Sequence, residues 1–287
     1  MDTTRANDDA NDDEYILGHS AHELGRLSAQ ARLYAPLVLS FLRAAGIEAG
    51  MRVLDVGCGG GDVSVFIAGL VEPTGQVVGI DRSATAIETA SRRAADLAAQ
   101  NMRFLVADAS TAYTELAAEG PFDAAIGRSV LEFVPDPAGM LRNVAALVRP
   151  GGMIAFQEVD WSGCRALPTV PTFSRCVTWG SEALQRSGAD PYVGLKLFAL
   201  FTDAGLLPPT LSVRAVVGAG SAHPLYAHIA GFIRTLMPTM EALGVATVSE
   251  VDIETLEQRL GDEVVSIGAT IVWVSLIEAA SRKAAEQ

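Results

Sequence analysis

The sequence predicts an α/β protein with a Rossmann-like, doubly wound sheet. Three observations support this prediction: short apolar runs alternate with helical patterns through the first half of the chain, a glycine-rich turn follows the first run, and single carboxylates follow the next two. Repeated strand, helix, strand units of this length place helices on both faces of a parallel sheet. With 287 residues, the chain is long enough for one such domain carrying a cap.

Short runs rich in Val, Ile and Leu predict five parallel strands. These runs are residues 52–56, 76–80, 102–106, 122–126 and 153–159. Helical patterns fill the intervals, at residues 62–70, 84–100, 111–118 and 137–148. The second half predicts helices at 172–187, 195–204, 224–243 and 250–260, and strands at 211–217 and 270–277. We therefore expect a helical lid insertion, about residues 222–262, between the last two strands.

The segment before the first strand divides into two parts. Residues 1–14 are acidic and polar, and they predict a disordered tail because they bury too little apolar surface to offset the entropy of ordering. Residues 15–48 carry apolar side chains at helical spacing, so we expect an N-terminal cap of one or two helices, with Pro36 at a break or a helix start. Residues 49–287 then form one domain.

Composition disfavours several classes of partner. A formal charge of −13 without a Lys/Arg cluster repels a phosphate backbone, so we expect no nucleic acid partner. No apolar run approaches the length of a membrane helix and the start does not resemble a signal peptide, so the expected location is cytoplasmic. Three widely spaced cysteines predict free thiols, without a disulfide framework or a zinc site.

The turn after the first predicted strand is the most informative segment. Its glycines are Gly57, Gly59, Gly60 and Gly61. Glycine lets the main chain turn sharply and lets a ligand lie against bare backbone at a helix start. A dinucleotide site would have a third glycine at the position of Asp62, and an Asp there repels a pyrophosphate. Asp62 and Asp55 favour a cationic cofactor, and the alternative is a turn that only packs a strand on a helix.

Two further carboxylates follow the second and third strands. Asp81 stands a little over 20 residues beyond the turn, where an acidic residue can hold both hydroxyls of a ribose. Asp108 can accept a hydrogen bond from the amino group of an adenine, or it can cap the next turn.

The run 53–61, followed by Asp81, Asp108 and the run 122–152, resembles class I S-adenosylmethionine-dependent methyltransferases, in particular the bacterial small-molecule group. The resemblance implies a seven-stranded sheet with an antiparallel last strand, S-adenosylmethionine as cofactor, and O-, N- or C-methylation of a small organic acceptor in secondary metabolism. It implies cofactor contacts from Tyr15, Asp55, Gly57, Cys58, Gly59, Asp81, Arg82, Asp108, Ala109, Arg128 and Ser129.

The acceptor is expected beyond the carboxyl ends of the strands, where ligands bind in doubly wound sheets. This points to residues 127–133 and 158–161. If the acceptor is a hydroxyl, a base among His19, Glu158 and Asp160 would remove its proton. His19 is equally explained as a helix cap or a solvated residue. The ligand pattern of catechol-type, metal-requiring enzymes is absent, so we expect no metal.

Several alternatives stay open at this point. A nicotinamide-dependent, NAD(P) oxidoreductase would use the same sheet, and a non-catalytic S-adenosylmethionine-binding protein would share the binding motifs. In the predicted insertion, Tyr226, Phe232 and Met237 either line a pocket or pack in the helix core. The sequence is compatible with a monomer and with a homodimer.

Overall fold

The computed structural model describes residues 21–111 and 116–285, with side chains from residue 33 onward. The strands are β1 Arg52–Val56, β2 Gln76–Asp81, β3 Met102–Val106, β4 Phe122–Arg128, β5 Val148–Asp160, β6 Arg165–Leu167, β7 Thr210–Gly218 and β8 Thr270–Arg282. The α-helices are α2 Ala21–Ala44, α3 Asp62–Val71, α4 Ala84–Asp96, α6 Pro137–Leu147, α7 Pro171–Arg186, α8 Leu197–Asp203, α9 Pro224–Ala242, α10 Val248–Val251 and α11 Leu256–Ile267. Short 3-10 turns are η1 Leu131–Phe133, η2 Trp161–Gly163 and η3 Val193–Lys196.

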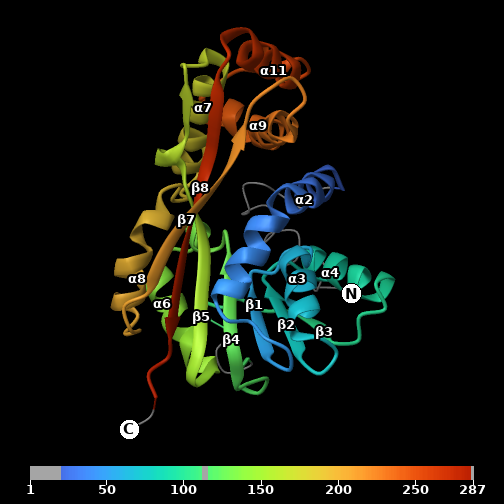
Figure 1. Ribbon diagram of the computed structural model, residues 1–287, viewed down its shortest axis with the longest axis vertical. Coiled ribbons are helices and arrows are strands. Elements are labelled where there is room, and N and C mark those ends of the chain that lie inside the picture. Colours follow the sequence, from blue (N-terminus) through green and yellow to red (C-terminus); the bar gives the residue numbers. More distant parts are fainter. Residues whose placement is uncertain (1–20, 112–115, 286–287) are drawn as a thin grey trace, which may run out of the picture.

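The strands form one sheet with helices on both faces (Figure 1). Its order is β3, β2, β1, β4, β5, β8, β6, and β7 also pairs with β8. Strands β1 to β5 pair in parallel, whereas β8 is antiparallel to β5. The prediction of a doubly wound sheet with an antiparallel last strand is therefore confirmed.

The described sheet has eight strands, not the seven expected. The additional strand is β6, in which Arg165 pairs with Val272 of β8. Val217 of β7 pairs with the same Val272, so β6 and β7 lie on opposite edges of β8. Since β5 also pairs along β8, β6 continues the β5 edge after the interruption at η2. The count differs because one strand is broken, and the layers stay as predicted.

Two helix predictions also need correction. α2 runs through Pro36 without ending there, so the described part of the N-terminal segment forms one helix. The helix expected at 250–260 is divided into α10 and α11, because Asp252 adopts a left-handed conformation with φ 46° and ends α10. No helix within the described ranges combines the length and hydropathy needed to cross a membrane.

Side chains of successive strand residues point to opposite faces of the sheet and pack into two hydrophobic cores, one on each face. Val53 packs on the face covered by α2, α3 and α9, whereas its neighbour Leu54 packs on the face covered by α6 and α8. The first core continues into α7, α9 and α11, which gather at one end of the molecule beyond the carboxyl end of β5 (Figure 1). We call these three helices, with the adjoining ends of β7 and β8, the upper lobe.

Candidate functional site

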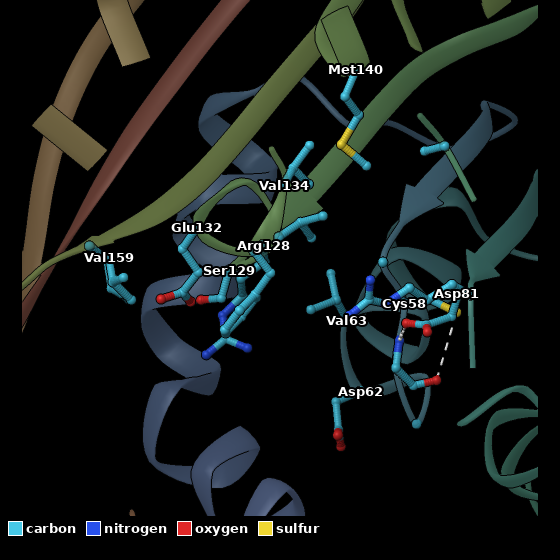
Figure 2. Close-up of a pocket in the computed structure, with 18 of the residues that line it drawn as sticks. Cys58, Asp62, Val63, Asp81, Arg128, Ser129, Glu132, Val134, Met140 and Val159 are labelled. Carbon is cyan, nitrogen blue, oxygen red and sulfur yellow. Dashed lines mark hydrogen bonds between the residues drawn. The ribbon is translucent and has the colours of Figure 1, made fainter. Parts of the chain in front are cut away.

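A cavity of about 280 Å³ lies at the carboxyl ends of the parallel strands, between the sheet and the upper lobe. The turns after β1, β2 and β3 form one part of its wall, and the loop after β4 together with residues from α7, α9 and β8 forms the rest. Figure 2 shows Asp81 and Cys58 on one side of this space and Glu132 and Val159 on the opposite side. The site is therefore one space bordered by two different parts of the molecule.

The glycine turn presents main chain to this cavity. Gly57, Gly59 and Gly61 have φ angles of 64°, 52° and 79°, a region that favours glycine. A Cβ atom on Gly57 would lie 2.6 Å from Cγ2 of Val130, in the loop after β4. The turn after β1 and the loop after β4 thus approach so closely that only a glycine fits between them.

Asp81 fixes the turn from the neighbouring strand. Its Oδ2 atom accepts a hydrogen bond from the Gly59 N–H at 2.9 Å (Figure 2). Its Oδ1 atom accepts one from the Ser83 N–H at 2.9 Å. Asp81 also lines the cavity. A single carboxylate therefore holds the turn in shape while facing the space beside it.

The other two carboxylates of the turn have different surroundings. Asp55 is buried behind the turn and accepts a hydrogen bond from the Ser64 hydroxyl at 2.5 Å; burial raises its pKa to about 7. Asp62 lines the cavity, and burial raises its pKa although Arg93 Nη1 lies 2.6 Å from its Oδ1. Because Arg93 forms an ion pair with Asp62 and partly neutralises its charge, Asp62 repels a pyrophosphate less than the sequence indicated.

Glu132 brings a further carboxyl group into the cavity wall. It belongs to η1 in the loop after β4, and only 7% of the residue is exposed. Burial raises the pKa of Glu132 well above its usual range, and the charge of Glu158 adds to this effect. Ser129, in the same loop, has a left-handed φ of 52°, a strained conformation for a residue with a side chain.

The part of the cavity next to the upper lobe is aromatic. We call this part the aromatic chamber; its wall residues are Tyr34, Trp161, Leu184, His228, Phe232 and Trp273. The Trp161 ring centroid lies 5.1 Å from that of Trp273 and 5.4 Å from that of Phe232. Such spacing is favourable for packed aromatic rings and leaves an apolar surface for a ligand.

The comparisons with known proteins agree with this geometry. Residues 47–183 match a family model described as a methyltransferase domain. This stretch of the chain therefore resembles a methyltransferase domain. A protein of Streptomyces fradiae, described as an uncharacterized 37.1 kDa protein in a transposon, is 34% identical over 221 residues, which are 68% of this chain and 60% of that protein. A ubiquinone biosynthesis O-methyltransferase of Ralstonia nicotianae is 39% identical over 131 residues, 43% of this chain and 50% of the relative.

Solved structures share the fold of this chain. The YcgJ protein from Bacillus subtilis has a TM-score of 0.57 at 16% identity, covering 87% of this chain and 99% of that chain. The [4+2]-cyclase SpnF has a TM-score of 0.52 at 18% identity, covering 88% and 82%. The alignments with the two sequence relatives span 60% and 50% of their lengths. These structures establish the fold, and the activity and the substrate are separate questions.

Most of the predicted cofactor residues lie on the wall of this cavity. Nine of them line the cavity: Gly57, Cys58, Gly59, Asp81, Arg82, Asp108, Ala109, Arg128 and Ser129. Asp55 lies behind this wall, and Tyr15 lies outside the described residues. Direct contact of each residue with the cofactor stays a prediction.

The predicted bases have other positions. His19 lies outside the described residues. Glu158 is fully buried and accepts hydrogen bonds from the N–H groups of Val130 and Leu131, at 3.1 and 3.2 Å. Asp160 accepts one from the Ser162 N–H at 3.0 Å at the start of η2. Neither carboxylate is part of the cavity wall, so their positions favour a role in holding the main chain over a role as base.

Sequence reasoning missed part of the acceptor side of the cavity. Glu132 lay inside the run 127–133, yet strand alternation gives no direction for a side chain on a 3-10 turn. In α9, His228 and Phe232 line the cavity, whereas Tyr226 and Met237 are buried in the core. Of the three residues considered from the sequence, Phe232 thus fits the pocket-lining interpretation, and Tyr226 and Met237 fit the core-packing one. Helical spacing alone did not separate them, because the sheet and the lobe both pack on this helix.

Proposed function

We propose that this chain transfers the methyl group of S-adenosylmethionine to a small, mainly apolar organic acceptor. The observation that carries the proposal is one cavity that joins the glycine turn to the aromatic chamber. A cofactor at the turn and an acceptor in the chamber would share this space, with no wall between donor and acceptor.

The residues at the turn fit the chemistry of this cofactor. Bare main chain at Gly57 and Gly59 leaves room for its amino acid portion, and Asp81 offers oxygens for its ribose hydroxyls. The side chain of Asp108 lies at the next strand end, in reach of an adenine that follows the ribose along the wall. The cavity carboxylates also match the positive charge on the sulfonium and the amino group.

The chamber fits the physical demands of methyl transfer. The reaction is an in-line displacement in which the sulfonium loses its charge, so it depends mainly on alignment and on exclusion of water. Packed rings of Trp161, Phe232 and Trp273 supply an apolar wall that would orient a flat acceptor. The ubiquinone biosynthesis O-methyltransferase of Ralstonia nicotianae has a name that likewise implies a small organic acceptor.

Titration calorimetry with S-adenosylmethionine tests this function. The wild type should bind, and Asp81→Asn should bind at least about tenfold more weakly, because the variant loses the charge that faces the cofactor and weakens its hold on Gly59. Asp96→Asn is the control, since Asp96 is exposed at the end of α4. Unchanged affinity in Asp81→Asn, or a thermal shift produced by NADH and not by S-adenosylmethionine, would contradict the proposal.

We also propose a cytoplasmic location and an acceptor that is not nucleic acid. The formal charge of −13 supports the second point. The thiols of Cys58, Cys164 and Cys176 are unpaired, which agrees with a reducing compartment. A homodimer is compatible with the sequence and stays a prediction.

A further inference from the structure

We infer that the carboxylate of Glu132 accepts the proton of an acceptor hydroxyl, so that this chain methylates oxygen on an aromatic molecule. The inference rests on the methyl transfer proposed above and adds to it the base, the methylated atom and the acceptor class.

The position of Glu132 is the first support. Glu132 lines the cavity on the side opposite Asp81 and Cys58 (Figure 2). Val159, also on the wall, lies on the same side of the space. A group at this position faces an acceptor and not the far end of the cofactor.

The second support is that Glu132, a residue only 7% exposed, has no hydrogen-bond donor to its side chain among the described residues. No group in the described ranges donates a hydrogen bond to its carboxylate, although its main-chain carbonyl accepts one from the Asp190 N–H at 2.8 Å. A buried carboxyl group without a donor is costly, and the cost falls when a ligand supplies one. An acceptor O–H inside the cavity is such a donor.

The loop that carries Glu132 is held firmly. Glu158 accepts hydrogen bonds from the N–H groups of Val130 and Leu131, directly before Glu132 in the chain. The Asp190 N–H holds the other side of the turn. Glu158 is therefore a positioning residue, and Glu132 is the group that touches the acceptor.

The chamber selects the kind of molecule that brings the hydroxyl. Trp161, Phe232 and Trp273 offer ring faces and edges, so a flat aromatic acceptor gains the most contact there. A phenol has a pKa near that of tyrosine, about 10, and needs a base to attack efficiently near neutral pH. A neutral amine needs no such base, so a carboxylate beside the chamber favours oxygen.

The step balances without another reactant. An oxygen lone pair of the acceptor forms the bond to the methyl carbon, and the carbon–sulfur bond breaks with its electron pair going to sulfur. The hydroxyl proton passes to Glu132, which becomes a neutral carboxylic acid and later loses the proton to solvent. The cofactor leaves as the uncharged thioether S-adenosylhomocysteine.

Charges around Glu132 determine when it is available as a base. Glu158 from β5 and Asp190 ahead of η3 raise its pKa further after burial has raised it, whereas Arg128 from β4 lowers it. The other titratable side chains on the cavity wall are Tyr34, Cys58, Asp62, Asp81, Arg82, Asp108 and His228. A bound sulfonium adds positive charge to this space and favours ionised Glu132, an effect that ends when the methyl group leaves.

The test measures the number of protons released on cofactor binding, by titration calorimetry at pH 7.5 in buffers of low and high ionisation enthalpy. S-adenosylmethionine should release more protons from the wild type than from Glu132→Gln, while both proteins bind it with affinities within about threefold. S-adenosylhomocysteine should give no such difference between the two proteins. Glu88→Gln, on the exposed face of α4, should match the wild type.

The outcomes separate this inference from the proposed function. Equal proton release from wild type and Glu132→Gln, or loss of cofactor binding in Glu132→Gln alone, would overturn the role of Glu132 and leave methyl transfer standing. Failure of the wild type to bind S-adenosylmethionine would remove both.

Turnover gives an independent readout with radiolabelled cofactor and two probes, 1-naphthol and 1-naphthylamine. We expect methylation of the naphthol, a loss of about 100-fold in kcat in Glu132→Gln, and a wild-type rate that rises with pH until Glu132 is ionised. Transfer to the naphthylamine but not to the naphthol would contradict the assignment of oxygen.

Discussion

Asp55 couples the stability of the fold to pH. Burial raises its pKa to about 7, the Ser64 hydroxyl opposes the shift and the charge of Asp81 adds to it. In an unfolded chain an Asp has a pKa of about 3.9, so the folded state binds this proton more tightly. The stability that Asp55 contributes is therefore complete below about pH 4 and is lost as the pH rises to about 7.

Asp55→Asn removes this titration and should change the pH profile. Between pH 4.5 and 7.5, the free energy of unfolding of the wild type should fall by about 1–4 kcal/mol more than that of the variant. Urea denaturation across this range measures the difference. Ser64→Ala should steepen the fall, because it removes the hydrogen bond that favours the charged form. Parallel profiles for wild type and Asp55→Asn would show that Asp55 does not titrate as argued.

Residue type and position along a strand were enough to find most of the cofactor wall, because glycines and carboxylates at strand ends converge in a parallel sheet. The same signal does not show that Asp55 lies behind the cavity wall, since a residue inside the strand faces whatever packs behind the turn. Nor does it show that the carboxylate of Glu158 accepts hydrogen bonds from the N–H groups of Val130 and Leu131, 28 and 27 positions away in sequence. Partners that far apart are set by the register of β4 and β5, which a single sequence does not give.

At the scale of elements, α7 and η2 pack closely against each other at the aromatic chamber. A Cβ atom on Gly180 would lie 2.5 Å from Cη2 of Trp161, so α7 accepts this indole only because it has a glycine there. Gly180→Ala should lower the free energy of unfolding by about 1–3 kcal/mol through overpacking. Gly69→Ala, in a helix with open space around it, should raise it by about 0.5–1 kcal/mol.

A double-mutant cycle isolates this contact. The double variant Gly180→Ala/Trp161→Phe should lose about 1 kcal/mol less unfolding free energy than the sum of the two single variants, since the smaller ring makes room for the methyl group. Urea denaturation of the four proteins gives the coupling energy. If the effects of the two substitutions on the free energy of unfolding simply add, the loss in Gly180→Ala does not arise from its contact with the indole of Trp161.

The elements that sequence reasoning placed well are those whose pattern is local. Strands β1 to β5 are apolar runs between turns, and their positions follow from composition alone. The break of β5 at η2, with β6 resuming on the same edge of β8, depends on Asp160 and on pairing with a strand more than 100 residues later. The division of α10 from α11 depends on one left-handed residue, Asp252, which no periodic pattern marks.

For the whole molecule, the sheet and the upper lobe share one core. Phe41 of α2, Val53 of β1, Ile233 of α9 and Leu276 of β8 belong to the same buried cluster. β7 and β8 also run from the sheet into the lobe (Figure 1). Because the core of the lobe continues into the sheet, we expect the sheet and the lobe to unfold together.

The distribution of tryptophan makes this testable. The three tryptophans of the chain, Trp161, Trp179 and Trp273, lie in η2, α7 and β8. Their fluorescence therefore reports on the lobe and the adjoining chamber, whereas far-ultraviolet circular dichroism reports on all elements. Thermal unfolding should give the same midpoint by both methods, and S-adenosylmethionine should raise both midpoints equally, because a ligand of one cooperative unit stabilises all of it. Separate midpoints, with the cofactor moving only the circular dichroism transition, would mean that the chamber is an independent unit and that the cavity between the two parts can open without unfolding the sheet.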